Sequence, residues 1–156
     1  MIDITTFEKH ALALELLRRH ALIAIIHEVT GIPNKVLRAT YKKMHGRSSK
    51  GGRPIESTKG LTRTLKEYQE ATLFAVYFNT VNAKIHEDQA RKVIVAFDTY
   101  KALLPGSRLD FSGMWVIAKE MRAEIISLLE CRCGSAVLIN AKEDLDDRCL
   151  VCKLRY

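Results

Sequence analysis

The chain has 156 residues, of which 47% are hydrophobic and only three are proline, so it can bury a core and does not have the composition of a disordered protein. No apolar run approaches the roughly 18 residues needed to cross a bilayer. The first nine residues include Asp3 and Glu8 and lack a basic lead into an apolar stretch. We therefore expect no signal peptide and a cytoplasmic protein that does not associate with a membrane.

The net charge of +7 is concentrated in one stretch. Residues 35–66 contain ten Lys or Arg and a single acid, Glu56, whereas the other 124 residues contain fifteen bases and seventeen acids. A localised positive field attracts polyanions such as nucleic acid. Charge alone leaves a second interpretation open, namely a solvated surface segment.

Apolar residues spaced by three and four predict a mostly α-helical fold with about five helices. The first helix is expected over residues 6–29, and Gly31 follows its end. The second begins at Pro33 and stops before Gly46, since Pro favours a first turn and Gly a C-terminal cap. Residues 47–54 contain no apolar side chain apart from proline and predict a basic loop.

Three further helices are expected over about residues 61–83 and 86–104, and from Asp110 or Ser112 onwards. The last one is predicted from a seam that repeats by four and three: Met114, Ala118, Met121, Ile125 and Leu128. The apolar run 73–78 exceeds what so small a bundle comfortably buries. We expect it to mark a surface for a partner protein.

The first two helices meet through a short turn at residues 29–33, which with a basic second helix predicts a helix-turn-helix. His27 stands four residues before Gly31, where many such motifs have a small residue. An ordinary helical hairpin is the other interpretation. Under the first, the DNA contacts come from Lys35, Arg38, Lys42, Lys43, Arg47, Lys50 and Arg53.

All four cysteines lie in the last 26 residues, as Cys131-Arg132-Cys133, fifteen residues, and Cys149-Leu150-Val151-Cys152. Two close pairs can present four thiolates as a tetrahedron, so we expect one structural Zn²⁺ with no open coordination position. Two disulfides or free thiols are the alternatives. We expect a helical domain over 1–130, and a zinc-binding knob with a short strand at 137–139 over 131–156.

An enzyme is not expected. The candidate carboxylates Glu143, Asp144, Asp146 and Asp147 have no histidine near them in sequence and no serine or cysteine nucleophile pattern. The five histidines are scattered, so neither a second metal site nor a small-molecule substrate is indicated. The main alternative to a DNA-binding protein is a zinc-stabilised adaptor that binds only protein.

From about residue 10 to Cys152 the sequence resembles the FlhC family of flagellar transcriptional activator subunits. The specific part is the pair of cysteine motifs together with residues 50–54, which match a Lys-Gly-x-x-Pro element. Shorter matches support it at Gly31-Ile32, Leu37-Arg38, Tyr41-Lys42 and Gly46.

The resemblance implies a mostly helical subunit with a four-cysteine zinc site. It also implies assembly with an FlhD-like subunit, binding to double-stranded DNA upstream of promoters, and activation of transcription in flagellum biogenesis. RNA polymerase is a further expected partner. Residues 55–59 stand where the family has an aromatic-rich turn, and the chain continues only four residues beyond Cys152, so a divergent, short relative is expected.

Overall fold

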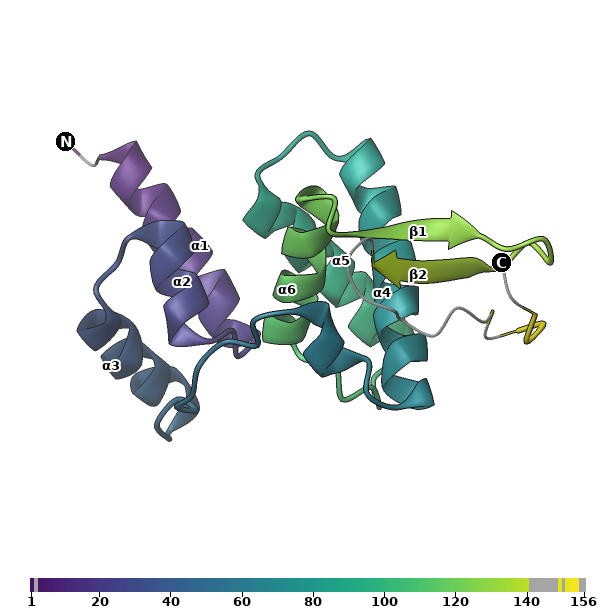
Figure 1. Cartoon of the computed structure of the whole chain (residues 1–156). Helices are drawn as coiled ribbons and strands as arrows, with labels where there is room; N and C mark the ends of the chain where they lie inside the picture. The colour runs from purple at the N-terminus through teal and green to yellow at the C-terminus, as the bar shows by residue number, and fades with distance from the viewer. Residues whose placement is uncertain (2, 141–148, 150, 155–156) are drawn as a thin grey trace. The chain divides into compact units, whose positions relative to one another are not determined.

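The structure, a computed structural model, describes residue 1, residues 3–140, residue 149 and residues 151–154. Within these residues there are six α-helices, one short 3-10 helix and one two-stranded sheet (Figure 1). The mostly α-helical fold predicted from the sequence is confirmed, with one helix more than expected. The chain forms two compact units, Met1–Pro54 with Asp110–Ser112, and Ile55–Leu109 with Gly113–Tyr156. None of the described helices is long and apolar enough to cross a membrane.

The first unit is built from three helices, α1 (Ile4–Arg18), α2 (Ile23–Thr30) and α3 (Asn34–His45), which all contact one another (Figure 1). Asp3 caps α1 by accepting a hydrogen bond from the N–H of Thr5 at 3.1 Å. The core between the three helices is aliphatic except for one tyrosine and includes Leu16, Leu17, Ile25, Ile26, Leu37 and Tyr41. Only the last two come from α3, so most of that helix is left exposed.

The prediction of one long helix over residues 6–29 is wrong, because the chain turns sharply between α1 and α2. His20 has a φ of 57°, in the left-handed region. The N–H of His20 donates to the carbonyl of Leu17, and that of Ala21 donates to the carbonyl of Leu16, both at 3.1 Å. This is the hydrogen-bond pattern of a Schellman motif, with His20 where glycine usually stands.

A short turn joins α2 to the basic helix α3, as both the predicted helix-turn-helix and an ordinary helical hairpin require. Gly31, at a φ of 72°, donates its N–H to the carbonyl of His27 at 2.8 Å and so ends α2. The Nδ1 of His27 lies 2.8 Å from the carbonyl of Ile32, which it bonds as a donor. The histidine that departs from the usual motif therefore braces the turn itself.

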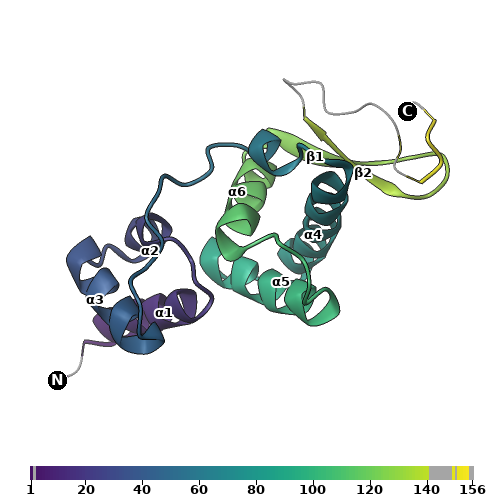
Figure 2. The same ribbon diagram turned by 90° about the horizontal axis from the view of Figure 1, so that it is seen from below.

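The second unit contains α4 (Leu65–Lys84), α5 (Gln89–Leu103), most of α6 (Phe111–Arg122) and the 3-10 helix Thr58–Leu61 (Figure 2). Thr64 and Glu67 form a capping box at the start of α4, and Asp88 caps α5. In the apolar run 73–78 three residues are buried, Phe74, Ala75 and Phe78. Phe74 stacks on Phe78, with ring centroids 6.2 Å apart, and meets Tyr100 edge-on at 6.0 Å. Leu73 is the one exposed residue of the run, at 36%. The broad apolar surface expected at residues 73–78 is therefore not found.

The unit ends in an antiparallel hairpin of β1 (Ile126–Glu130) and β2 (Ala136–Asn140), in which Leu128 pairs with Leu138 (Figure 1). The strand predicted at 137–139 is confirmed, but the helix predicted through Leu128 is wrong. Glu124 has a φ of 57° and ends α6 in a second Schellman motif, in which Ile125 donates to the carbonyl of Glu120 at 2.9 Å. The hairpin packs on α4, where the buried hydroxyl of Tyr68 donates to the carbonyl of Leu138 at 2.6 Å.

Candidate metal centre and nucleic-acid interface

The four cysteines, which come from two separate parts of the chain, lie together. Cys131 and Cys133 lie in the turn between β1 and β2, and Cys149 and Cys152 come from a later segment. The Sγ atoms of Cys131 and Cys152 are 3.6 Å apart, as are those of Cys133 and Cys149. All four sulfur atoms lie within 4.8 Å of one another.

Each cysteine pair is held in a tight backbone turn. In the first, the N–H of Gly134 donates to the carbonyl of Cys131 at 2.8 Å. In the second, the N–H of Lys153 donates to the carbonyl of Cys149 at 2.9 Å, and the N–H of Val151 points at the Cys149 sulfur from 3.4 Å. These bonds hold the backbone from which the thiols project.

Ser135 adds a polar contact that the spacing of the cysteines does not indicate. Its hydroxyl lies 2.8 Å from the sulfur of Cys133 and 3.1 Å from that of Cys149. The hydrogen bond from Ser135, followed by the backbone N–H of Cys152, lowers the pKa of Cys149 to about 6. Ser135 also lowers the pKa of Cys133. The cluster is therefore prepared to carry thiolates, which are the form that binds a metal.

Cys131 behaves differently from its neighbours. The backbone hydrogen bond from Cys133 lowers the pKa of Cys131, but burial and the neighbouring thiols together raise it to about 11. Several sulfurs crowded together cannot all ionise without a cation among them. A metal that binds here must therefore displace protons from the cluster.

The donor set fits a closed tetrahedral metal site. Four thiolates around a Zn²⁺ with bonds of about 2.3 Å would lie about 3.8 Å from one another, close to the separations observed here. The sulfurs are too far apart for disulfide bonds, and all four cysteines are free thiols. Tetrahedral four-sulfur sites take zinc or iron. With all four positions filled, such a site is structural.

The seven basic residues expected to contact DNA all lie in the first unit. Lys35, Arg38, Lys42 and Lys43 are on α3, and Arg47, Lys50 and Arg53 follow in the loop after it; each of the seven is exposed. In the part of the chain that the structure describes, none of them forms an ion pair or a side-chain hydrogen bond. No described acidic side chain therefore neutralises their charge.

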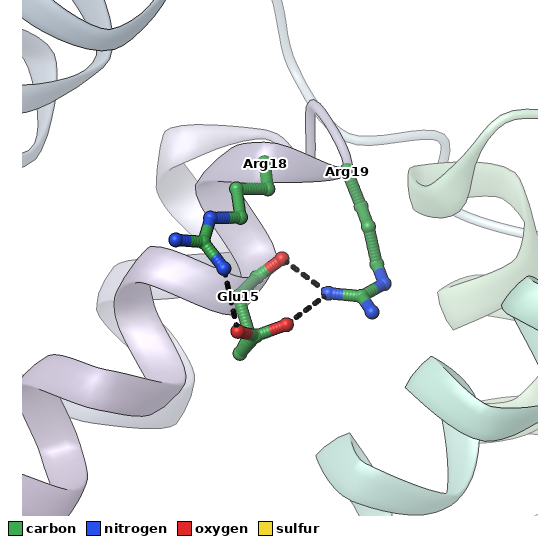
Figure 3. A network of polar contacts seen from close by, with 3 residues as sticks. All are labelled: Glu15, Arg18 and Arg19. Atoms are coloured by element: carbon green, nitrogen blue, oxygen red, sulfur yellow. Dashed lines mark hydrogen bonds and ion pairs between the residues drawn. The ribbon is translucent and has the colours of Figure 1, made fainter.

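Elsewhere in the same unit arginines are paired with an acid. Glu15 accepts from Arg18 Nη1 at 3.1 Å and from Arg19 Nη1 at 2.7 Å, and Arg19 also donates to the backbone carbonyl of Glu15 at 2.8 Å (Figure 3). This contrast shows that the basic surface of α3 and its loop is a distinct electrostatic feature, not the general character of the unit.

A ring cluster at the end of α3 was not predicted from the sequence. The Nδ1 of His20 lies 2.9 Å from the hydroxyl of Tyr41, and the rings of His20 and His45 are 4.3 Å apart. His45 also donates from Nε2 to the carbonyl of Leu17 at 3.0 Å. The cluster joins the ends of α1 and α3. Partial burial, followed by the charges of His45, Arg47 and Lys50, lowers the pKa of His20.

The remaining candidates from the sequence are placed as follows. His20 bonds Tyr41 and His27 bonds Ile32, so the two histidines have separate structural partners. The carboxylates Glu143, Asp144, Asp146 and Asp147 lie outside the described residues.

The fold and the thiol cluster define a mostly α-helical protein with a candidate structural metal site. The family model described as "Flagellar transcriptional activator (FlhC)" matches residues 4–155, and the chain therefore belongs to the FlhC family. This is a family of transcriptional activators and not of enzymes. No curated protein matches the sequence.

Proposed function

We propose that this chain is the DNA-binding subunit of a bacterial transcriptional activator complex, with α3 and the loop after it as the DNA-binding surface. One observation carries the proposal: seven exposed cations in one helix and its loop, with no acidic partner among the described residues. Unpaired Lys and Arg side chains of this kind bind the phosphates of a DNA backbone. The helix-turn-helix geometry supports α3 as the helix that approaches a groove.

In this proposal Cys131, Cys133, Cys149 and Cys152 hold one structural Zn²⁺. The thiol geometry and the lowered pKa of Cys149 support the assignment. Iron, which also accepts four thiolates, is the alternative that elemental analysis excludes or establishes. Residues 131–156 are then the zinc-stabilised segment, and residues 1–130 supply the DNA and protein contacts.

Family membership supports a heteromer with an FlhD-like subunit. In this proposal the heteromer is cytoplasmic and recruits RNA polymerase to promoters. The surface available for a partner differs from that expected at residues 73–78. On α1 the side chains of Ile4, Phe7 and Leu14 are 71%, 64% and 40% exposed. These positions recur at spacings of three and seven, which places them along one side of the helix. Such an apolar stripe is unusual on a surface without a partner.

Co-purification with an FlhD-like protein, followed by genome-wide capture of bound DNA, tests the proposal. Duplex binding by the complex is then measured at two salt concentrations. Lys50→Ala and Arg53→Ala should weaken binding to all sequences alike, and each should flatten the slope of log K against log salt by up to about 0.9. Lys9→Ala removes an equal charge from α1, outside the basic stretch, and serves as the matched control.

A complex that forms but shows no affinity for any duplex would favour the protein-only adaptor. The exposed stripe on α1 is compatible with that function. Unchanged binding in both loop variants would instead move the DNA-binding surface away from this loop.

A further inference from the structure

The basic residues of the first unit are not spread evenly, because three of them line a hollow. The hollow has a volume of about 430 Å³ and is bounded by the start of α2, one side of α3 and the loop residues 48–52. Arg38 and Lys42 line it from α3, and Lys50 lines it from the loop. The first two are four residues apart, so they lie one turn apart on the same side of the helix.

The lining contains donors and cations but no acid. Ile23 and Ala24, in the first turn of α2, lie against the hollow, and their N–H groups have no hydrogen-bond partner among the described residues. Leu22 precedes them without a side-chain cap. Gly51 and Gly52 line the hollow from the loop and carry no side chain, which lets a ligand approach their backbone.

A cluster of cations with a purely structural role would include a carboxylate as counter-charge. Arg38, Lys42 and Lys50 repel one another, and no carboxylate is among the described residues that line the hollow. The same unit pairs Arg18 and Arg19 with Glu15 (Figure 3), so counter-charges are used where they stabilise the fold. A concave group of unpaired cations and free N–H donors is complementary to a compact anion.

We propose that the hollow binds one phosphate group of a DNA backbone, held by Arg38, Lys42 and Lys50. The inference rests on the proposed function, which supplies the duplex. It divides the basic surface into two parts. Arg38, Lys42 and Lys50 fix the position of α3 on one phosphate, whereas Lys35 and Lys43 do not line the hollow. Phosphate contacts of this kind set the orientation of a recognition helix without reading sequence.

The first test uses inorganic phosphate, titrated into the zinc-loaded chain and followed by amide chemical shifts. We expect shifts that saturate and that concentrate at Ile23, Ala24, Gly51 and Gly52. Replacing both Arg38 and Lys42 by Gln should weaken this binding by about tenfold or more, since charge-assisted hydrogen bonds are lost. Replacing both Lys35 and Lys43 by Gln removes the same charge from the same helix and should change it by less than about twofold. Equal losses in the two double variants, or shifts spread over the whole basic surface, would overturn the proposal.

The second test distinguishes a backbone phosphate from a free one. A duplex is prepared with single neutral methylphosphonate groups at successive positions. Among the positions that weaken binding to the unmodified protein, one should lose its effect in the Arg38→Gln, Lys42→Gln double variant, because the two changes remove the same contact. The loss should persist in the Lys35→Gln, Lys43→Gln double variant.

The outcomes separate this proposal from the proposed function. Duplex binding without any position that depends on Arg38 and Lys42 overturns the phosphate hollow and leaves the DNA-binding function standing. The other outcome is a complex that binds inorganic phosphate in the hollow and binds no duplex. That result overturns both the DNA-binding function and the assignment of the hollow to a DNA phosphate. Thermal unfolding of each double variant, matched to that of the unmodified chain, shows that the substitutions act on binding and not on folding.

Discussion

Gly134 and Lys153 occupy matching positions in the two cysteine turns. Their φ values are 86° and 62°, and each donates its N–H to the carbonyl of the first cysteine of its turn. Glycine adopts this left-handed conformation without cost, whereas a lysine there costs on the order of 1 kcal/mol or more. The second turn is therefore the more strained of the two.

We expect Lys153→Gly to tighten metal retention about fivefold by relieving this strain. Lys153→Ala removes the charge but keeps the side-chain penalty, so it should have little effect. Gly134→Ala should weaken retention by about 1–2 kcal/mol through conformation alone, since no atom lies within 4 Å of the added Cβ. Gly106→Ala, at a position without a left-handed φ, is the control. Competition with a chelator measures all four, and equal retention in Lys153→Gly and Lys153→Ala would contradict the argument.

Removal of the metal should loosen the cysteine turns and leave the helices folded. Metal binding commonly contributes on the order of 10 kcal/mol to such small segments, but Val137 and Leu138 of β2 are fully buried against the rest of their unit. Amide hydrogen exchange after chelation should rise at residues 131–135 and 151–154, and stay low at β2 and α4. Cys149→Ser should reproduce this pattern. Loss of protection throughout α4 would show that the metal holds the whole unit together.

The first unit should lose stability as the pH falls below about 6.5. The pKa of His20 in the folded chain lies below its ordinary value of 6.5, so the unfolded chain binds more protons in the range between the two values. Stability is full above the unfolded pKa and declines as the pH falls towards the folded one. His20→Asn should reduce this pH dependence, because asparagine tolerates a φ of 57° and carries no titrating group. Denaturant midpoints at pH 7.5 and pH 5.5 give the comparison, and an unchanged difference in the variant would rule His20 out as the cause.

Helical periodicity predicted most of the fold, and its two boundary errors have one physical cause. Both missed helix ends are Schellman motifs whose left-handed residue is not glycine, namely His20 and Glu124. At neither place does the sequence have the glycine that usually marks the end of a helix. After Glu124 the spacing of Ile125 and Leu128 also suited a helix, but cross-strand pairing with β2 decided the conformation.

The parts of the candidate site that depend on the spacing of residues along the sequence could be predicted. The parts that depend on contacts between distant segments could not. Two close cysteine pairs indicated the cluster of four thiols, and charge counting indicated the basic stretch. The contact of Ser135 with two thiols arises only once the hairpin brings Cys149 beside it. Likewise, Lys50 joins Arg38 only because the loop folds back to the start of α2. Such contacts between distant parts of the chain leave no local pattern in the sequence.

The hydrogen bond from Tyr68 to Leu138 should measure how firmly the cysteine hairpin is attached to the helices. The donor is buried on α4, the acceptor is a backbone carbonyl of β2, and the distance is 2.6 Å. Tyr68→Phe keeps the ring and removes only the hydroxyl, so it should lower the free energy of unfolding by about 1 kcal/mol. Tyr77→Phe is the matched control on the same helix, because its hydroxyl has no hydrogen-bond partner among the described residues.

The measurement is denaturant unfolding of the metal-loaded chain, together with exchange of the β2 amides. Tyr68→Phe should speed exchange in β2 while the metal content stays unchanged, because the hydrogen bond that is lost ends on the Leu138 carbonyl and not on a cysteine. Equal stabilities for Tyr68→Phe and Tyr77→Phe would mean that apolar contacts of Val137 and Leu138 alone hold the hairpin. A fall in metal content in Tyr68→Phe would instead mean that docking of the hairpin on α4 is required to assemble the four thiols.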